Sequence, residues 1–442
     1  MRQRLFGWGR HPDVEAWQIE GEDLEAITSD VVLTRGLGRS YGDASLPPPG
    51  PLRVAATRRA ERILSFDPTT AVLHAEAGLS LEHLHGVLLE RGYFVPVTPG
   101  TEQVTLGGML AADVHGKNHH VAGTIGSYVQ ALRLRLPDGS IKRVDAANSS
   151  QDLRELFHAT IGGMGLTGHI LDVEMRMEAI ATPWLVESSQ VENDLESLIA
   201  ALRCAAHEWP FTVAWADLMA HGAGKGRGIL LKGRWAELSQ SHAQAPRRSR
   251  QLTIPCAAPH ALLSNFTIAC HNTLRMAAAR RAPASRLTTP QRFFYPLDRV
   301  GRWNLLYGRR GLTQYQCVLP WDPGMTSYRR LVDIATRHGA GPFLCVIKDC
   351  GAAGAGLLSF PMPGISFAMD FPIVDGVTQS LVDDLNDHVA TVGGRIYLAK
   401  DAFTRRLHFE AMEPRLGRWR ELRRRLDPQR RVRSALGDRL LD

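Results

Sequence analysis

The stretch RGLGRSYGDASL, Arg35 to Leu46, follows a short apolar run and spaces its three glycines as GxGxxxG, at Gly36, Gly38 and Gly42. Glycine permits tight turns and leaves backbone N–H groups open to a ligand. A Rossmann dinucleotide site needs GxGxxG at the start of a helix, whereas three prolines follow here, at residues 47–49. The loop therefore does not predict a site of the Rossmann type.

Two further glycine clusters lie downstream. TPGTEQVTLGGMLAADVHGKNHHVAGTIG spans Thr98 to Gly126, and GGMGLTGHI spans residues 162–170. The latter matches GxGxxG but leads into an alternating stretch that predicts a strand, so the Rossmann interpretation fails there too. Either cluster alone is compatible with a tight turn. Three glycine-rich loops together expose many backbone N–H groups and predict a dinucleotide held by loops.

Length and charge limit the remaining possibilities. A chain of 442 residues is too long for one hydrophobic core and favours two domains. The formal charge of +7 favours anionic partners: phosphates, nucleic acid or an acidic membrane surface. The six cysteines form no CxxC pair, which indicates reduced thiols. We expect no signal peptide and no membrane span, because no apolar segment is long enough for either.

Apolar spacing predicts a helix in LSLEHLHGVLLERG, with Ser80 as its N-cap and Gly92 at its end. Alternation predicts a β-hairpin in LRLRLPDGSIKRV, residues 132–144. After about residue 180 the glycine clusters thin out, and helices alternate with short strands: helices in 194–209 and 327–339, strands in 314–320 and 343–349. Two polar stretches, 239–251 and 280–291, are typical of mobile loops or lids.

The segment PRLGRWRELRRRLDP holds an arginine-rich helix with Leu416, Trp419, Leu422 and Leu426 on one face. This apolar stripe predicts docking onto the protein, with the arginines on the opposite face. A solvated face is the favoured interpretation of those arginines, ahead of an anionic lipid surface and then nucleic acid. No recognised nucleic-acid module accompanies them, so we expect no nucleic-acid partner.

Several of these motifs together resemble the FAD-dependent decaprenylphosphoryl-β-D-ribose 2-oxidase family, which belongs to the vanillyl-alcohol-oxidase type of flavoproteins. The resemblance runs from about residue 30 to the C-terminus. It is carried by the three glycine clusters, by GGRIYLAKD at residues 393–401, and by two longer segments at 296–320 and 357–373. It implies an α+β fold: a two-part PCMH-type FAD-binding domain plus a substrate domain with a mainly antiparallel sheet flanked by helices.

The resemblance also implies the domain boundaries and the cofactor. We expect a FAD-binding domain at 1–179, a substrate-binding domain at 180–393, and a C-terminal segment, 394–442, that returns to the FAD-binding domain. A histidine in the first glycine loop often tethers the flavin in the wider superfamily, but Arg39 stands at the corresponding place. FAD is therefore expected to bind without a covalent link.

The expected cofactor contacts come from all parts of the FAD-binding domain. Their positions are Arg35, Gly36, Leu37, Gly38, Arg39, Ser40, Tyr41, Gly42, Asp43, Gly100, Thr101, Thr105, Leu106, Gly107, Gly108, Ala112, Asp113, Val114, His115, Gly123, Gly126, Ile170 and Tyr397.

Oxidation of an alcohol needs a group that receives the hydroxyl proton and others that orient the carbon. Lys400, Lys348 and Lys117 each match a lysine of the family's active site, and partial burial can lower a lysine pKa toward neutrality. Taken alone, a lysine in a strand is more often a solvated edge residue. Because Tyr397 and Lys400 would point to opposite faces of a strand, both reach the flavin only if the chain leaves the sheet. Asp401, the next residue, is expected to hold Lys400 charged.

Four further residues complete the expected catalytic set. Gln314 and Gln316 fall on one strand face, where they either aim at a sugar or are simply exposed. His115 and Tyr41 are expected beside the flavin. The histidines at 115, 119 and 120 do not predict a metal site, because no cysteine or carboxylate pair accompanies them.

Three positions of the expected substrate pocket depart from the family pattern. Ala368 replaces a cysteine familiar from mycobacterial members, Ser366 replaces a neighbouring asparagine, and Phe294 occupies an aromatic position. An alanine at this place removes the thiol that nitroaromatic inhibitors of the family capture. These changes leave the identity of the sugar and its carrier open.

The implied reaction is oxidation of the C2 hydroxyl of a polyprenyl-phosphate-linked ribofuranose, as the first half of an epimerisation in cell-envelope synthesis. The partner would be a separate NAD(P)H-dependent short-chain reductase. The expected location is the cytoplasm, with peripheral contact at the inner membrane face. Two alternatives stay open at this point: an oxidase of an aldonolactone, a sugar alcohol or a glycoside, and a basic membrane- or nucleic-acid-binding protein without catalysis.

Overall fold

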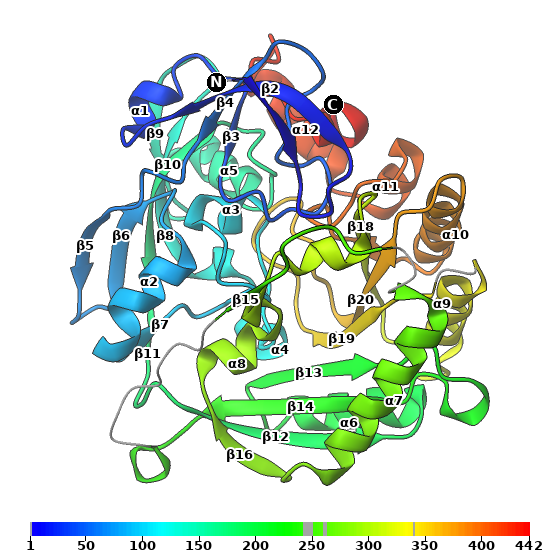
Figure 1. Ribbon diagram of the computed structural model, residues 1–442. Coiled ribbons are helices and arrows are strands. Elements are labelled where there is room, and N and C mark those ends of the chain that lie inside the picture. The colour runs from blue at the N-terminus through cyan, green and yellow to red at the C-terminus, as the bar shows by residue number, and fades with distance from the viewer. Residues whose placement is uncertain (1, 242–250, 260–262, 339–340) are drawn as a thin grey trace.

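The computed structural model describes residues 2–241, 251–259, 263–338 and 341–442. Within these ranges the chain has the predicted α+β fold. Sheets formed by the first 180 residues lie above a larger sheet formed by strands between residues 185 and 396 (Figure 1). Of the two segments predicted as loops, most of 239–251 lies outside the described residues.

The described N-terminal region contains a four-stranded sheet in the order β1-β2-β4-β3. Leu5 and Ala16 are buried on one face, while Arg2 and Arg4 form ion pairs on the exposed face. The first glycine loop leaves this sheet directly after β3. The strands are β1 (Arg2–Phe6), β2 (Asp13–Glu20), β3 (Leu33–Arg35) and β4 (Arg53–Ala56).

An antiparallel five-stranded sheet, in the order β5-β6-β10-β8-β9, follows within the described ranges. The predicted hairpin is confirmed: β8 and β9 pair across a turn in which Gly139 has φ +90°. Leu132 and Leu134 are buried, whereas Arg133 and Arg135 are partly exposed. The strands are β5 (Ile63–Asp67), β6 (Val72–Glu76), β8 (Val129–Arg135), β9 (Ile141–Val144) and β10 (His169–Arg176).

The helix predicted after Ser80 is confirmed as α2 (Leu81–Leu88), continued by η1 (Leu89–Arg91). The Ser80 hydroxyl accepts a hydrogen bond from the N–H of His83 at 3.2 Å, and Gly92 ends the segment with φ +83°. The third glycine cluster leads directly into β10, as predicted, and opens no helix. This glycine cluster is therefore a loop before a strand and not the helix start of a Rossmann site.

The chain between residues 185 and 396 builds a mainly antiparallel sheet in the order β16-β12-β14-β13-β19-β20-β18-β21, eight strands within the described ranges. The strands are β12 (Leu185–Glu192), β13 (Phe211–Ala216), β14 (Gly228–Trp235), β16 (Ser285–Thr288), β18 (Leu312–Leu319), β19 (Leu344–Cys350), β20 (Gly364–Pro372) and β21 (Arg395–Ile396). The loop prediction for 280–291 is wrong, because β16 forms there and pairs with β12.

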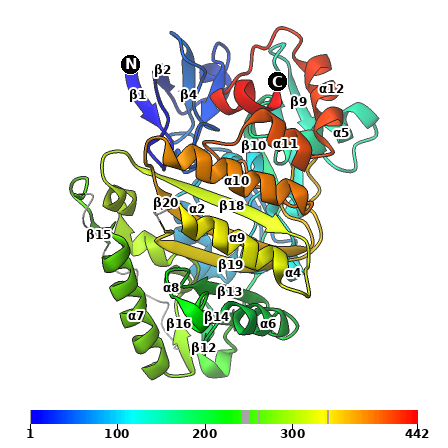
Figure 2. The same ribbon diagram turned by 90° about the vertical axis from the view of Figure 1, so that its right-hand side faces the viewer.

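Helices α6 (Leu195–Ala206), α9 (Thr326–Arg337) and α10 (Val377–Thr391) cover one face of this sheet (Figure 2). Tyr328 of α9 packs against Phe367 of β20, with ring centroids 5.7 Å apart and the rings tilted by 42°. Tyr315 of β18 donates a hydrogen bond to Asn386 of α10 at 2.9 Å. Residues that alternate with Tyr315 and Phe367 therefore point to the opposite face of the sheet.

Shorter elements connect these layers. They are α1 (Leu24–Ile27), β7 (Tyr93–Phe94), α3 (Leu106–Ala111), α4 (His119–Ala122), η2 (Ile125–Tyr128), α5 (Gln151–Thr160), β11 (Glu178–Ala179), η3 (Gly222–Gly224), η4 (Leu238–Gln240), β15 (Leu252–Thr253), α7 (Asn265–Arg281), α8 (Pro290–Phe294), η6 (Pro296–Arg299), β17 (Val300–Gly301), η7 (Trp303–Tyr307), α11 (Arg406–Met412), α12 (Leu416–Leu426) and η8 (Gly437–Leu441). None of the helices in the described ranges has the length and apolar character needed to cross a bilayer.

The arginine-rich helix α12 docks through the predicted stripe. Trp419 is fully buried and donates its indole N–H to the carbonyl of Ala159 at 3.2 Å. The prediction that all the arginines face outward is wrong for Arg423, which is buried against Asp427 at 2.6 Å. Other arginines form ion pairs with Glu155, Glu410 and Asp438 (from Arg418, Arg425, Arg420, Arg430 and Arg433). This pairing favours a solvated face.

The C-terminal segment also contacts the first glycine loop. Arg439 forms ion pairs with Asp43 at 2.7 Å and with Asp401 at 2.8 Å. Figure 1 shows this segment beside the N-terminal strands, with both chain ends in the same part of the molecule. The predicted boundaries at 179/180 and 393/394 stay a proposal, but these contacts support a C-terminal segment that completes the N-terminal region.

A chain truncated after residue 390 is expected to lose FAD binding together with activity. The truncation removes Arg439 and Asp401, and with them the contacts that hold the first glycine loop. Flavin content per protein, measured by absorbance after gel filtration, tests this. Retention of one flavin per truncated chain would contradict the proposal and would show that the cofactor region is contiguous.

Candidate active site

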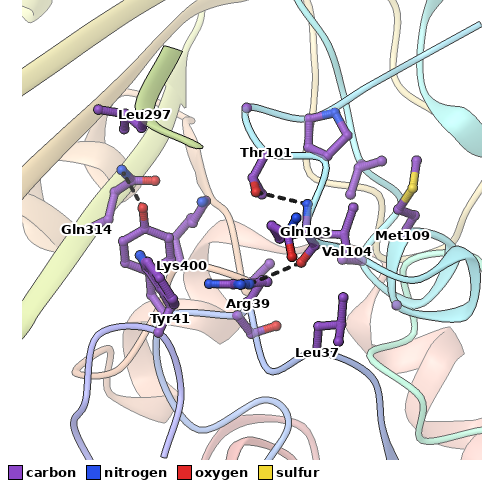
Figure 3. A pocket seen from close by; sticks show the side chains of 18 of the residues that line it. Leu37, Arg39, Tyr41, Thr101, Gln103, Val104, Met109, Leu297, Gln314 and Lys400 are labelled. Carbon is purple, nitrogen blue, oxygen red and sulfur yellow. Dashed lines mark hydrogen bonds between the residues drawn. The ribbon is translucent and has the colours of Figure 1, made fainter. Parts of the chain in front are cut away.

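A cavity of about 570 Å³ lies between the glycine loops and the uncovered face of the large sheet. This volume is within the range of small-molecule and cofactor sites. In Figure 3, Leu37, Arg39 and Tyr41 from the first loop lie on one side, and Thr101, Gln103 and Val104 from the second loop lie on another. Gln314 and Lys400 project from the substrate side and the C-terminal segment.

Most of the predicted site residues line this cavity. Those that do are Gly36, Leu37, Gly38, Arg39, Ser40, Tyr41, Gly100, Thr101, Thr105, Gly107, Gly108, Ala112, Val114, His115, Lys117, Ile170, Phe294, Gln314, Gln316, Lys348, Ala368, Tyr397 and Lys400. The predicted residues outside the lining are Arg35, Gly42, Asp43, Leu106, Asp113, Gly123, Gly126 and Ser366.

The residues outside the lining hold the loops in place. The Arg35 guanidinium donates to the carbonyls of Phe6 and Ser45 at 2.7 and 2.9 Å, and Asp43 binds Arg439. A β-carbon on Gly42 would clash with the carbonyl oxygen of Asp401, so this glycine permits the close approach of two chain segments. These residues shape the cavity indirectly, because they fix the backbone of the loop that lines it.

The remaining five have similar supporting positions. Asp113 accepts a hydrogen bond from the N–H of Gly126 at 3.0 Å, Gly123 ends α4, and Leu106 is buried at the start of α3. Ser366 is buried beside Gln316 and accepts a hydrogen bond from its amide at 3.4 Å. The sequence motifs gave no signal that separates these five residues from those that line the cavity.

The first glycine loop offers free amide donors. Among the described residues, none accepts a hydrogen bond from the backbone N–H of Leu37, Gly38, Arg39 or Ser40. Buried or half-buried N–H groups are rarely left without a partner, and consecutive free N–H groups form a concave anion site. Across the cavity, a β-carbon on Gly100 would meet no atom within 4 Å, so bare backbone leaves that space open for a ligand.

The register of the large sheet gathers the polar residues of the opposite wall. Gln316 lies opposite Ala368, and Ala368 lies opposite Val346. Gln314 and Lys348 are two residues from Gln316 and Val346 along their strands, so all of them point to the uncovered face. The prediction that the two glutamines share a face is confirmed, and both are buried in the cavity wall.

His115 is held between the second glycine loop and this wall. The amide of Gln316 donates to its Nε2 at 2.9 Å. Burial, with the nearby Lys348, His119 and Lys400, lowers the pKa of His115 well below its usual value. The ring is therefore neutral with its proton on Nδ1, and that buried atom has no partner among the described residues. An unsatisfied donor in the wall is consistent with a ligand acceptor in the cavity.

The chain leaves the sheet before Lys400, as predicted. β21 ends at Ile396, and the N–H of Lys400 donates to the carbonyl of Tyr397 at 2.9 Å, which closes a turn. This turn lets the Tyr397 and Lys400 side chains both reach the cavity. The Lys400 ammonium lies over the ring of Tyr41, 4.0 Å from its centroid.

Burial lowers the pKa of Lys400 to about 7. The nearby Asp370 raises it and Lys348 lowers it further, but desolvation is the largest cause. The prediction that Asp401 holds Lys400 charged is wrong: Asp401 pairs with Arg439 and caps the backbone of Thr404 at 3.0 Å. The carboxylate that acts on Lys400 is Asp370 on β20.

Lys117 and Lys348 occupy different surroundings. The Lys117 ammonium donates to the carbonyl oxygens of Phe293 and Phe294, and burial lowers its pKa to about 7. Burial also lowers the pKa of Lys348. His119 and His120 bond the N–H of Gly351 and the carbonyl of Trp209, which are structural roles. The described residues contain no cluster suited to a metal ion.

Comparison with known proteins gives two kinds of match. An FAD binding domain model matches residues 27–145. The decaprenylphosphoryl-β-D-ribose oxidase of Mycolicibacterium smegmatis is 34% identical over 99% of this chain and 97% of its own length. The chain belongs to the decaprenylphosphoryl-β-D-ribose oxidase family. It is an FAD-dependent oxidoreductase that acts on CH–OH groups, as predicted.

Two further relatives extend the comparison. An uncharacterised protein in the mprA 5′ region of Streptomyces coelicolor is 33% identical over 82% of this chain and all of its own length. A D-lactate dehydrogenase of Archaeoglobus fulgidus is 29% identical over 33% of each chain. The family likeness thus spans almost the whole chain, whereas the likeness to this lactate dehydrogenase covers one third.

The cavity fits the FAD that the family uses. The free N–H groups of the first loop suit a pyrophosphate, and the polar wall around His115 and Gln316 suits the edge of a flavin. Which of the predicted residues contact FAD stays a proposal. The sequence motifs did not single out Asp370, Asp298 or Arg275, three charged residues in or beside the cavity. Asp370 had a visible signal, because it is one acidic residue inside the apolar run FAMDFPI.

Asp298 joins the two halves of the cavity. It accepts hydrogen bonds from the hydroxyl of Thr101 at 2.9 Å and from the N–H of Glu102 at 2.8 Å. Burial raises its pKa to about 6. No local pattern around PLDR predicts this contact, because its partners lie almost 200 residues earlier in the sequence.

The FAD of this family member is expected to be released completely by acid precipitation. Arg39 stands where a tethering histidine would lie, and its guanidinium donates to the carbonyl of Gln103 at 3.1 Å and stacks 4.1 Å from the Trp8 ring. Absorbance of supernatant and pellet measures the distribution. Yellow colour that stays with the denatured pellet would contradict this and would identify His115 as the first residue to examine.

Proposed function

We propose that this chain oxidises the C2 hydroxyl of a ribofuranose linked to polyprenyl phosphate, giving the 2-keto sugar. The observation that carries the proposal is the desolvated Lys400 in a cavity between free backbone amides and a polar sheet face. The M. smegmatis relative, an oxidase of decaprenylphosphoryl-β-D-ribose, supports the choice of substrate. Arginines on the surface of the C-terminal segment pair with carboxylates, so they give no comparable support for a non-catalytic role.

FAD supplies the acceptor for the hydride that leaves C2. The unprotonated amine of Lys400 takes the proton from the C2 hydroxyl. As the C2–H bond breaks, the C2–O single bond becomes the double bond of the ketone. A pKa of about 7 keeps a large fraction of Lys400 in the amine form at neutral pH. Asp370 then stabilises the ammonium that forms.

The two glutamines orient the sugar. The Gln314 amide donates to Asp370 and lies 3.5 Å from the Tyr41 hydroxyl. The Gln316 amide nitrogen is engaged by His115 and Ser366, which leaves its oxygen to accept a hydrogen bond from a sugar hydroxyl. Buried, fixed groups of this kind reduce the entropy cost of reaching the reactive geometry.

A keto product calls for a second enzyme. Reduction from the opposite face of the sugar would complete an epimerisation, and a separate NAD(P)H-dependent short-chain reductase is the partner we propose. A substrate with a polyprenyl tail also places the enzyme at a membrane surface, and we propose peripheral contact at the inner face. Ala368 lines the cavity, and no cysteine is among the described residues that line it.

The rate of flavin reduction is expected to rise with pH through a pKa near 7, because only the amine form of Lys400 accepts the proton. Lys400→Ala should retain FAD but reduce at least about 100-fold more slowly, and it should lose this pH dependence. Asp370→Asn should move the inflection to lower pH, because the carboxylate raises the pKa of Lys400. Anaerobic stopped-flow measurements from pH 5.5 to about 9 provide the test.

Arg405→Gln, at an exposed ion pair with Asp383, is the control and should behave like the wild type. A near wild-type reduction rate in Lys400→Ala would show that Lys400 is not the base and would point to Lys348 or Lys117 instead. Loss of activity with an unchanged pH profile would identify an electrostatic role instead.

Under anaerobic conditions, farnesylphosphoryl-β-D-ribofuranose is expected to bleach the flavin and to yield a product lighter by two hydrogen atoms. An aldonolactone, a sugar alcohol and a methyl glycoside form the comparison panel. Faster bleaching by any of these would replace the proposed substrate with that carbohydrate. After borodeuteride reduction, the NMR spectrum of the deuterated sugar shows whether the carbonyl was at C2 or elsewhere.

A further inference from the structure

Arg275 of α7 reaches the cavity from the side opposite Lys400. The sheet there is apolar: Val213, Trp215, Leu231 and Leu344 line the cavity. The Arg275 guanidinium lies 4.3 Å from the centre of the Trp215 ring. Trp215 lies opposite Val346 on β19, which in turn lies opposite Ala368 on β20. The cavity wall therefore runs from polar groups near Lys400 to an apolar surface on which one cation, Arg275, lies over Trp215.

This guanidinium has no carboxylate partner. Among the described residues, Arg275 forms no ion pair or hydrogen bond, and burial alone lowers its pKa to about 10. The undescribed segments 242–250, 260–262 and 339–340 contain no Asp or Glu. A half-buried guanidinium without a carboxylate is costly, because arginine at such sites normally forms paired hydrogen bonds. The cation is left available for an anionic ligand.

The other cations near the cavity are engaged or lose their charge. Lys117 donates to two carbonyl oxygens, and burial lowers its pKa to about 7, as it does for Lys400. Arg39 donates to Gln103 on the glycine-loop side. Arg302 is exposed and donates to the carbonyl of Pro255 at 3.3 Å. Arg275 is thus the unpaired guanidinium on the apolar side, within the described residues, and it keeps its charge at neutral pH.

We propose that Arg275 binds the phosphate of a sugar phosphodiester whose apolar tail lies along the surface of Trp215, Leu231 and Leu344. This inference rests on the proposed function and names the residue that distinguishes a phosphate-linked sugar from a neutral glycoside. The planar guanidinium presents two parallel N–H groups that match two phosphate oxygens. Its stacking on Trp215 fixes the plane of the fork before the ligand arrives. Arg275 is a specificity residue and takes no part in the proton transfer.

Steady-state oxidation of two matched substrates tests this role. One is farnesylphosphoryl-β-D-ribofuranose, and the other is farnesyl β-D-ribofuranoside, which has the same sugar and tail but no phosphate. In Arg275→Gln, KM for the phosphodiester should rise about 10- to 100-fold, with kcat almost unchanged. KM for the neutral riboside should stay the same. Arg275→Lys keeps the charge without the fork and should fall between the two.

Arg281→Gln is the matched control, because Arg281 lies on the same helix and is exposed. It should retain wild-type KM for both substrates. Each variant is first compared with the wild type in flavin content and melting temperature, and Arg275→Lys replaces Arg275→Gln if the latter does not fold. An equal change in KM for the two substrates would overturn the proposal, because it would show that Arg275 only shapes the cavity.

A binding measurement separates this inference from the proposed function. Calorimetric titration with farnesyl phosphate, and with farnesol as the uncharged control, uses the FAD-loaded enzyme and requires no turnover. Weaker binding of farnesyl phosphate to Arg275→Gln, with no oxidation of the ribosyl phosphodiester by the wild type, would support the phosphate site and reject the ribose. Oxidation of the phosphodiester with equal KM in wild type and Arg275→Gln would reject the phosphate site alone.

Discussion

The antiparallel register of β18, β20 and β19 is the constraint on which the active site depends. Side chains alternate between the faces of a strand, so a slip of one residue would turn Gln316, Ala368 and Lys348 away from the cavity. Packing prevents that slip, because Tyr315 and Phe367 are buried against α10 and α9 on the other face. The hydrophobic core therefore sets the geometry of the catalytic wall.

The C-terminal segment adds Lys400, a catalytic candidate that the sheet does not carry. Lys400 follows the short strand β21, and its turn is fixed by contacts on both sides. Arg439 lies between Asp43 and Asp401, and these carboxylates raise the pKa of its guanidinium despite burial. This ion-pair cluster joins the first glycine loop to the lysine-bearing turn. The same ion pairs therefore hold both the cofactor site and the proposed proton acceptor in place.

The sequence predicted those features that depend on local pattern or on long motifs. The cap at Ser80, the hairpin at Gly139 and the shared face of Gln314 and Gln316 follow from spacing alone. Side-chain contacts that only the fold brings together were not predicted. Asp401 is adjacent to Lys400 in sequence, yet the sheet register brings Asp370 to it instead. Arg423 was likewise expected on a solvated helix face, but its side chain is buried and pairs with the buried Asp427.

The cavity contains two lysines whose charge changes near neutral pH and an arginine whose charge does not. Lys117 and Lys400 both have a pKa of about 7, so their mean charge at neutral pH depends on what else is present. An anion that enters raises the pKa of a nearby lysine and favours proton uptake, whereas a neutral sugar hydroxyl meets amines that can accept a proton. Arg275 keeps its charge in either case. The cavity therefore contains groups that can exchange protons together with a permanent cation, and a substrate whose sugar hydroxyl is followed by a phosphate and then an apolar tail matches that combination.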